Sequence, residues 1–436
     1  MKFLCMHRLN VHPLLAFAFW ISVLSVVSLH GQPVLDSFDA NVNGTVRAIA
    51  VQPDGKIIIG GDFTSVGGSN YASLARLHRD GTVDASFTNR AVTNVLSLAL
   101  QADGKILVGW SSAMIRVNTD GTRDTTYGVV SAVTNIGAII VQPDGRALAS
   151  RQGATFRLNA SGTLSFSAPH GNPVMALQMD GKIVFRSNYW GEGTLRRLNA
   201  NGTLDTNFSV TAYFPGNPTY TYISALIIQP DGKILAGGLF DWLNGPKSSL
   251  GRLNPDSTLD PDFTASAFGV GPMARQSNGK IVFYETSSSI RRCTSTGSSE
   301  TNFEFTVSGG DFYRVQKIAL QPDGNILVAG SFTSVNGETR NSLARIIAGD
   351  LPPGAPPQFT SISKHPGNVF RFHATNLDQT NLSALAVLFS PKVAAPLNQW
   401  TPVASPVSLV GGEFQFTDPS LATNPPARFY RLSYQP

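Results

Sequence analysis

The chain has 436 residues, a formal net charge of +5 and only 14% charged residues, together with 41 glycines and 27 prolines. A charge this weak and scattered excludes the basic footprint of a nucleic-acid-binding protein, and two cysteines, Cys5 and Cys293, exclude a disulfide-rich fold. Many turn residues and few charges are typical of short strands joined by tight turns.

Residues 1–31 predict a secretory signal peptide. Lys2 and Arg8 make the start basic, Leu14–Val27 is apolar, and the small residues Ser28 and Gly31 follow as alternative cleavage positions. The apolar run is shorter than the roughly 20 residues that span a bilayer. We therefore expect a secreted or cell-surface protein with no membrane span after signal removal, and a membrane anchor is the alternative.

The phrase QPDGK recurs with small changes seven times between residues 52 and 325. The copies begin at Gln52, Gln101, Gln142, Gln178, Gln229, Gln276 and Gln321. Alternating apolar runs flank each copy, such as Val46–Val51 and Ile57–Ile59, so its Asp-Gly (Asn-Gly in one copy) occupies a tight hairpin turn. Spacings of several tens of residues indicate an array of supersecondary units.

A second phrase, of the form LARLHRDGTVDASF (Leu74–Phe87), adds a strand, a turn and a further strand to each unit. Seven units of four strands without helical patterning predict an all-β, seven-bladed β-propeller over residues 32–350. The last unit lacks its fourth strand, whereas an orphan copy, VLDSF (Val34–Phe38), precedes the first. We expect this N-terminal strand to complete the seventh blade.

An arginine in the second phrase is followed eight positions later by an acidic residue. This spacing predicts cross-strand ion pairs that act as structural staples, with a ring of ligand-binding arginines as the alternative. The expected pairs are Arg76 with Asp84, Arg116 with Asp124, Arg197 with Asp205, Arg252 with Asp260, and Arg292 with Glu300. The third blade has Ser165 in place of the acid, so we expect no pair there.

Longer phrases show a family resemblance. GGDFTSVGG (Gly60–Gly68) and GSFTSVNGE (Gly330–Glu338), each following a QPDG turn and preceding a LAR phrase, resemble the delta-60 repeat family of exported bacterial propellers. The segment is missing from the second, third, fourth and sixth units, whose connections are shorter. The resemblance implies a propeller fold and export, and it implies no catalytic residues.

The sequence offers no recognisable catalytic or cofactor site. Six aspartates in the QPDGK-type phrases could be taken for acidic ligands, but each precedes a glycine in a separate turn, and turn chemistry explains them better than metal binding. They are Asp54, Asp103, Asp144, Asp180, Asp231 and Asp323. Histidine is scarce, and no nucleophile or metal motif is present. We expect no catalytic residue, no metal and no cofactor.

Specificity is expected where the units differ, in the loops that join second to third strands and successive blades. Aromatic residues gather in those loops of the fourth and fifth blades: Tyr189, Trp190, Tyr213, Phe214, Tyr220 and Trp242. With nearby asparagines they suit a sugar face or a protein surface. The alternative is that they fill gaps between blades.

Beyond the propeller, residues 351–358 read as a proline-rich linker. Short alternating runs over residues 359–436 predict a small β-sandwich.

These features favour an exported, noncatalytic binding module whose propeller loops bind a glycan or an extracellular protein, and we expect a monomer. A propeller-type polysaccharide lyase or glycosidase, and a structural envelope protein, are the alternatives, because propellers host many functions.

Overall fold

The computed structural model describes residues 33–88, 92–128, 130, 134–187, 193–213, 222–242, 248–311 and 314–348, and seven strands between 358 and 434. The predicted signal peptide, residues 349–350 and residues 351–357 of the predicted linker lie outside these ranges. All regular elements that the described residues form are strands. No helix among them is long and apolar enough to cross a membrane.

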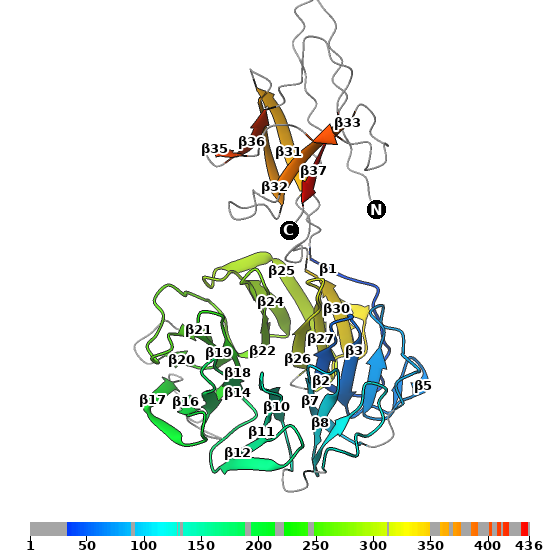
Figure 1. Ribbon diagram of the computed structural model, residues 1–436, viewed down its shortest axis with the longest axis vertical. Helices are drawn as coiled ribbons and strands as arrows, with labels where there is room; N and C mark the ends of the chain where they lie inside the picture. The colour runs from blue at the N-terminus through cyan, green and yellow to red at the C-terminus, as the bar shows by residue number, and fades with distance from the viewer. Residues whose placement is uncertain are drawn as a thin grey trace, which may run out of the picture. The chain divides into compact units, whose positions relative to one another are not determined.

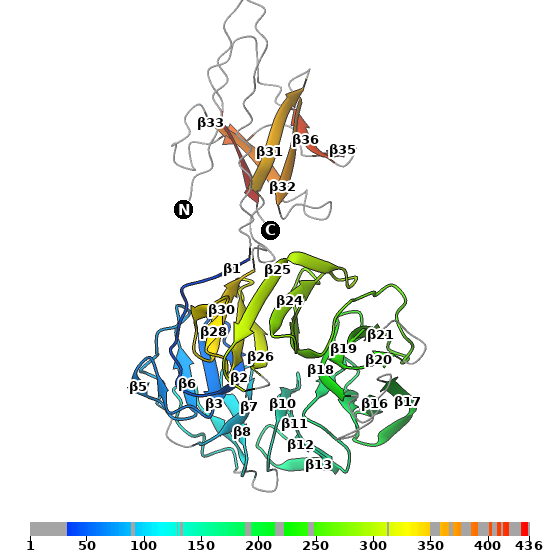
Figure 2. The same ribbon diagram turned by 180° about the vertical axis from the view of Figure 1, so that it is seen from behind.

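Residues 33–348 form seven antiparallel blades around a ring. The first strands of neighbouring blades contact one another and lie innermost (Figures 1 and 2). They are β2 (Val46–Val51), β7 (Val95–Leu100), β10 (Ala138–Val141), β14 (Met175–Leu177), β18 (Tyr222–Ile228), β22 (Val270–Arg275) and β26 (Val315–Leu320). The seven-bladed propeller expected from the repeats is therefore confirmed.

The second strands form the most buried layer because both of their faces pack against neighbouring blades. In the first blade, Ile57 and Ile59 belong to the same core cluster as Leu327 of the seventh blade, whereas Ile58 belongs to the cluster that contains Val95 of the second. This two-sided burial explains why these strands are continuous apolar runs. The second strands are β3 (Ile57–Gly61), β8 (Ile106–Trp110), β11 (Ala147–Arg151), β15 (Ile183–Arg186), β19 (Ile234–Leu239), β23 (Ile281–Glu285) and β27 (Ile326–Gly330).

The third strands complete the regular part of each blade. They are β6 (Leu74–Leu77), β9 (Met114–Val117), β12 (Ala154–Leu158), β16 (Gly193–Leu198), β21 (Leu250–Leu253), β24 (Ser289–Cys293) and β30 (Leu343–Ile347).

The outermost strand varies between blades. It is β13 (Leu164–Ala168) in the third blade, β17 (Leu204–Tyr213) in the fourth and β25 (Ser299–Ser308) in the sixth. In the first, second and fifth blades it is reduced to a single bridge, such as that between Leu77 and Val83. The expected fourth strand is short there because the chain turns at once: in the first blade, Phe87 N donates to Asp84 O at 3.1 Å.

The ring is closed by β1 (Val34–Leu35), which pairs with β30 of the seventh blade. Asp36 then binds Arg345 at 2.6 Å, and Phe38 is buried against the first blade. The N-terminal strand thus completes the seventh blade, as the orphan VLDSF copy predicts, and covers an edge that would otherwise expose unpaired backbone groups.

The C-terminal region forms two small antiparallel sheets. One has the order β31 (Gln358–His365), β32 (Val369–Thr375), β36 (Glu413–Thr417) and β35 (Ser408–Val410). The other has the order β34 (Thr401–Pro402), β33 (Leu385–Ser390) and β37 (Phe429–Tyr434), and β31 contacts β37. This arrangement agrees with the predicted small β-sandwich.

Candidate functional site

The seven blades expose two different faces. One carries the Asp-Gly turns between first and second and between third and fourth strands, and we call it the turn face. The other carries the connections from second to third strands and from blade to blade, and we call it the loop face. The repeated phrases of the sequence lie on the turn face, and the variable segments lie on the loop face.

The turn face is held together by internal contacts. Each aspartate of the QPDGK-type turns accepts a hydrogen bond from the backbone two residues on, as Asp54 does from Lys56 N at 3.1 Å. The same bond occurs at Asp103, Asp144, Asp180, Asp231 and Asp323. Among the described residues, no group of three or more His, Cys, Asp or Glu could hold a metal ion.

The repeated arginines lie on the same face and bind the expected acids. Five pairs have N–O distances of 2.6–2.9 Å, and Arg292 also binds Glu300: Arg76–Asp84, Arg116–Asp124, Arg197–Asp205, Arg252–Asp260 and Arg345–Asp36. In the third blade, Arg157 faces no acid at Ser165, but it keeps the ring contact of the series and lies over Phe166 at 4.5 Å. Every arginine of the series lies over an aromatic ring, at 4.3–4.8 Å.

Each arginine of the series also reaches the next blade, which the sequence pattern did not indicate. Its Nη1 donates to a backbone carbonyl in the neighbouring turn, as Arg116 does to Ala160 O at 2.9 Å. The other acceptors are the carbonyls of Thr119, Ala200, Pro255, Ser295, Ala348 and Arg79. These seven bonds run around the whole ring, so the arginines bind their own protein and form a structural belt.

On the loop face, three long connections act as straps between blades. We use the name straps for residues 65–70, 241–242 and 334–339. In the seventh blade, β28 (Ser334–Val335) pairs with β25 of the sixth, and β29 (Glu338–Thr339) folds back on it. In the first blade, Val66 of β4 (Ser65–Val66) bridges Val42, and β5 (Ser69–Asn70) pairs with β4.

The fifth blade has the third strap, and it includes one of the predicted ligand-binding residues. Its β20 (Asp241–Trp242) pairs with β17 of the fourth blade, so that Trp242 lies opposite Ala212 and Asp241 opposite Tyr213. The backbones of Tyr213 and Trp242 are thus brought together from two blades. The other predicted aromatics, Tyr189, Trp190, Phe214 and Tyr220, lie outside the described residues.

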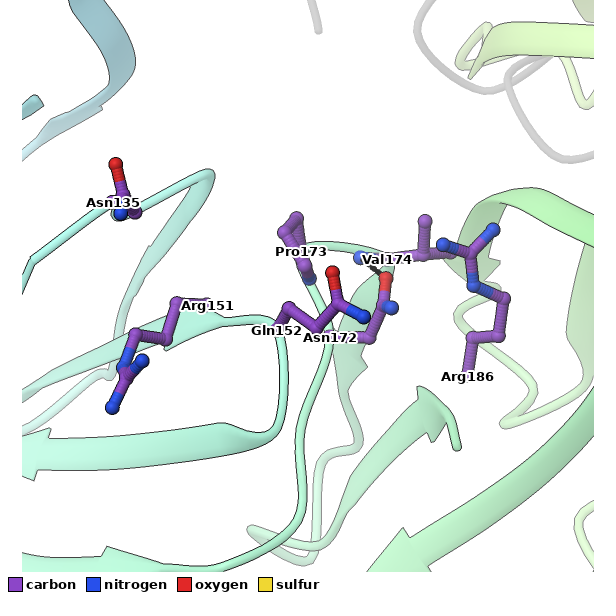
Figure 3. A pocket seen from close by; sticks show the side chains of 7 residues that line it. All are labelled: Asn135, Arg151, Gln152, Asn172, Pro173, Val174 and Arg186. Atoms are coloured by element: carbon purple, nitrogen blue, oxygen red, sulfur yellow. Dashed lines mark hydrogen bonds between the residues drawn. The ribbon is translucent and has the colours of Figure 1, made fainter. Parts of the chain in front are cut away.

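The third blade has no strap, and a cavity of about 470 Å³ lies between it and the fourth blade on the loop face. A two-residue turn, Gln152–Gly153, joins β11 to β12. Figure 3 shows the lining side chains, with Arg151 and Arg186 on opposite sides of Gln152 and Asn172. The seven lining residues are Asn135, Arg151, Gln152, Asn172, Pro173, Val174 and Arg186.

Shortened inner strands make room for this cavity. In the other five blades, the pairing of the first two strands is interrupted by a β-bulge near the loop face, as between Val315 and Lys317. β10 and β14 pair with unbroken register and have only four and three residues. Because these inner strands begin later, their blades leave space at the loop face that the bulged strands occupy elsewhere.

The cavity walls are fixed by hydrogen bonds within the protein. Arg186 Nη1 donates to the carbonyl of Ile223 in the fifth blade at 2.7 Å. Asn172 Oδ1 accepts from Val174 N at 3.0 Å, and Ser150 Oγ donates to Asn172 O at 2.8 Å. The site is therefore preorganised rather than assembled by its ligand.

Arg151 is held less tightly than Arg186. Its guanidinium carbon lies 5.8 Å from the Phe156 ring centroid. Its Nε is buried and has no hydrogen-bond partner among the described residues. Two guanidinium groups and three amides can donate hydrogen bonds to an anion or to hydroxyl groups.

The cavity could not be located from the residue at the end of the second strand. Arg151 occupies this position in the third blade, whereas the first, fifth and seventh blades have Gly61, Gly238 and Gly330. A Cβ at Gly330 would lie 1.7 Å from the backbone oxygen of Arg314, so only glycine fits there. Trp110 and Glu285 occupy the position in the second and sixth blades, whose first strands are bulged, so a long side chain does not by itself indicate that the bulge is missing.

Similarity to known proteins was found at the level of the repeat and of the fold. The model of a family described as a domain of unknown function (DUF5122) beta-propeller matches residues 52–87, 101–127, 178–208, 229–263 and 321–347. No curated protein matches the chain.

Solved propellers resemble the chain in structure at low sequence identity. A streptogramin B lyase is 16% identical with a TM-score of 0.51, covering 72% of this chain and 97% of its own. A virginiamycin B lyase from Staphylococcus aureus is 14% identical with a TM-score of 0.51, covering 72% and 98%. The WD40 beta propeller domain of Doa1 is 13% identical with a TM-score of 0.51, covering 72% and 96%. The matched repeats and the solved structures support a β-propeller built from repeats, which is the fold of this chain.

Proposed function

We propose that the protein is an exported, noncatalytic binding module of the delta-60 repeat type that binds a glycan on its loop face. The observation that carries the proposal is the cavity between the third and fourth blades, which is lined by five side chains able to donate hydrogen bonds. Shaped cavities with a few convergent polar groups on a rigid scaffold are typical ligand sites.

The chemistry of the lining supports a sugar ligand. Sugars carry many hydroxyl groups, which amide and guanidinium donors bind well. Aromatic residues occur beside the cavity in the sequence, since Tyr189 follows Arg186 by three residues. The paired strands that contain Tyr213 and Trp242 belong to the fourth and fifth blades, next to the wall that Arg186 provides. Stacking of such rings on sugar faces would add to the polar contacts.

The same lining favours binding over cleavage. Lyases and glycosidases need a group that takes up or releases a proton, commonly a carboxylate, a histidine or a tyrosine. The seven lining residues are two arginines, three amides, a proline and a valine. These residues hold and orient a ligand without supplying that group.

A glycan array tests this function. Residues 32–436 would be applied to the array, and the same oligosaccharides would be incubated with the protein and analysed for cleavage by mass spectrometry. The proposal predicts retention of a defined set of glycans with no cleavage. Cleavage would establish an enzyme instead, and the absence of retention would contradict glycan binding.

A matched pair of variants locates the binding. Gln152→Ala removes an exposed amide at the cavity, whereas Asn70→Ala removes an exposed amide from a strap on the same face. We expect Gln152→Ala to weaken retention and Asn70→Ala to leave it unchanged. Equal effects of the two substitutions would place the glycan elsewhere on the loop face.

Export has its own test. We propose that the apolar N-terminal segment directs secretion and is removed after Ser28 or Gly31. Sequencing the N-terminus of the protein recovered outside the producing bacterial cytoplasm should identify one of these positions. An intact Met1 in that fraction would contradict signal cleavage.

A further inference from the structure

The innermost strand of the seventh blade carries a lysine where the corresponding strands carry small residues. Lys317 follows the β-bulge of β26 and pairs with Ala329 of β27. In the first, second and fifth blades, the residues that follow the bulge in the same register are Ala48, Ser97 and Ala225. β26 is one of the first strands that surround the centre of the ring (Figure 1), and Lys317 is exposed to solvent. One point of this inner rim therefore carries a long basic side chain.

Lys317 differs from the other lysines of the described propeller because its amine has no partner. The five others each bind a carboxylate, at 2.8–3.4 Å: Lys56, Lys105, Lys182, Lys233 and Lys280. A carboxylate at this distance favours the protonated, charged form of a lysine. No hydrogen bond or ion pair joins Lys317 to any residue that the structure describes. Its amine is therefore not held in the charged form by a neighbour.

The strands packed against β26 supply no acid that is free to pair with Lys317. These strands are β2, β22, β23 and β27, and their charged residues are Arg47, Arg275 and Glu285. Glu285 is buried and binds Arg291, and Arg47 binds Asp62. Desolvation by the surrounding protein is the only cause that acts on the pKa of Lys317, and it lowers that pKa. More of this amine is uncharged at neutral pH than in an ordinary lysine, and the uncharged amine is the nucleophile.

We propose that Lys317 is a carbonyl-reactive site, at which the side-chain amine condenses with a small aldehyde. The lone pair of Nζ attacks the carbonyl carbon, and a C=N bond replaces the C=O bond. The two amine hydrogens and the carbonyl oxygen leave together as water, so the product is an imine and no oxidant or reductant is consumed. A single amine without neighbouring donors is a poor anion site, whereas imine formation needs only one nucleophile.

Reductive trapping tests the proposal. Residues 32–436 would be incubated at pH 7 with propionaldehyde and sodium cyanoborohydride, which reduces each imine to a stable secondary amine. Peptide mass spectrometry at increasing times then gives the alkylation rate of each lysine. Lys317 should react about tenfold or more faster than the paired Lys56 and Lys105, because a pKa that is one unit lower raises the uncharged fraction about tenfold.

A second pair of probes distinguishes the two sources of such a carbonyl, a free aldehyde and the open-chain form of a reducing sugar. Maltose replaces propionaldehyde in one sample, and maltitol, which has no carbonyl, is its control. Trapping of maltose at Lys317 would add reducing sugars to the ligand class. Trapping of propionaldehyde alone would restrict the class to free small aldehydes. The result is independent of glycan binding at the cavity, which the array tests separately.

Two variants separate a reactive amine from a merely exposed one. Asn70→Lys adds an exposed lysine to a strap on the loop face, and the introduced amine should react more slowly than Lys317 at pH 7. Lys317→Ala should fold, because Ala48 and Ala225 occupy this position in other blades, and it should remove the fast-reacting amine.

The preference for Lys317 must also depend on the folded ring. In urea, Lys317 and the paired lysines should react at similar rates, so a preference that survives unfolding would overturn the proposal. Equal rates at Lys317 and at the lysine introduced by Asn70→Lys would overturn it as well. Should Lys317→Ala fail to fold, the comparison with Asn70→Lys and the urea sample carry the test, because both keep Lys317.

Discussion

In five blades, one carboxylate receives both the arginine of the third strand and the lysine of the QPDGK-type turn, and in four of these blades both contact the same oxygen. Lys105 Nζ lies 2.8 Å from Asp124 Oδ2, to which Arg116 also donates, while Asp124 Oδ1 accepts from Thr126 N at 2.9 Å. Lys56, Lys182, Lys233 and Lys280 occupy the same position in their blades, at 2.8–3.4 Å from the acid. The acid thus stabilises the turn that it begins, through the bond from Thr126 N, and its contacts with the lysine and the arginine connect it to the second and third strands of its blade.

These contacts lower the pKa values of the acids. Hydrogen bonds from Lys105 and Thr126 hold the pKa of Asp124 well below its usual range, against the opposing effect of burial. Burial alone would raise the pKa of Asp260, but Lys233 and Arg252 lower it to about 2. A carboxylate whose pKa falls on folding stabilises the folded state wherever it is ionised.

Asp124→Asn provides a test of this linkage. At pH 7 the variant should be less stable than the unaltered protein by about 1.5–3 kcal/mol, the contribution of hydrogen bonds to a charged group. The contribution is fully present above the unfolded pKa of about 3.9 and is lost as the pH falls towards the lowered folded value. Urea unfolding from pH 7 to pH 2 should show the difference shrinking below about pH 4. A difference that stays constant with pH would contradict the assignment.

The third blade offers a second test at the residue scale. Arg157 bonds to Ala200 O at 2.6 Å and stacks on Phe166, but it has no acid partner at Ser165. Arg116 makes both kinds of contact and an ion pair as well. Arg116→Gln should therefore lower the melting temperature more than Arg157→Gln does, measured by calorimetry. Equal losses would show that the carbonyl and ring contacts dominate the belt.

At the scale of elements, the segment G-x-F-x-x-V-x-G acts as a strap rather than as a binding loop. Phe63, Phe240 and Phe332, the aromatic residues of the three segments, are all buried. The hairpin of β28 and β29 pairs with the outer strand of the sixth blade, which joins blades at their outer edge. The straps and the arginine belt therefore fasten the blades on opposite faces of the ring.

Phe332→Ala tests the strap. Removing this fully buried ring should cost about 3–5 kcal/mol, and hydrogen exchange should increase in β28 and in the end of β25 that pairs with it. Phe268→Ala is the control, because Phe268 is 59% exposed, and it should change stability little. Unchanged exchange in β25 after Phe332→Ala would argue against a fastening role.

The repeated parts of the fold could be predicted from the sequence, whereas the cavity could not. Each QPDGK-type turn and each arginine–acid spacing depends on residues close in the chain, so local rules apply. The cavity depends on the short first strands of the third and fourth blades, β10 and β14. It also combines residues that are far apart in the sequence, such as Asn135, Arg151 and Arg186. The residue at the end of the second strand does not reveal the difference, because Trp110 and Glu285 occupy that position in blades whose first strands are bulged.

The predicted aromatic site could be located only in part from the sequence. The sequence predicted that residues of the fourth and fifth blades meet, and the pairing of β17 with β20 brings Tyr213 and Trp242 together. The assignment of these aromatics to a ligand stays a prediction. Arg186 connects them to the cavity, since it belongs to the fourth blade and bonds to the fifth.

At the scale of the whole molecule, the first and last repeats depend on each other. Phe38 stacks under Arg345 at 4.7 Å, and a Cβ at Gly81 would lie 2.8 Å from the Phe38 ring. Gly81 has a φ of +95°, so glycine is favoured both by its conformation and by the close ring. Residues separated by most of the propeller sequence thus meet at the closure, and these contacts form only when both ends of the propeller are folded.

Phe38→Ala tests the closure. Loss of this buried ring should cost about 3–5 kcal/mol and should increase hydrogen exchange in β1 and β30, because the seventh blade loses its cover. Phe87→Ala removes the equivalent ring between the first and second blades, so it should destabilise the protein without exposing β30. Identical exchange patterns for the two variants would contradict a special role for the N-terminal strand.

A crystal structure of residues 32–436 grown with a glycan that the array retains tests the proposed binding site most directly. We expect sugar density in the cavity between the third and fourth blades, in contact with Gln152 and Asn172. An empty cavity, with the glycan bound at another place on the propeller, would contradict the proposed site.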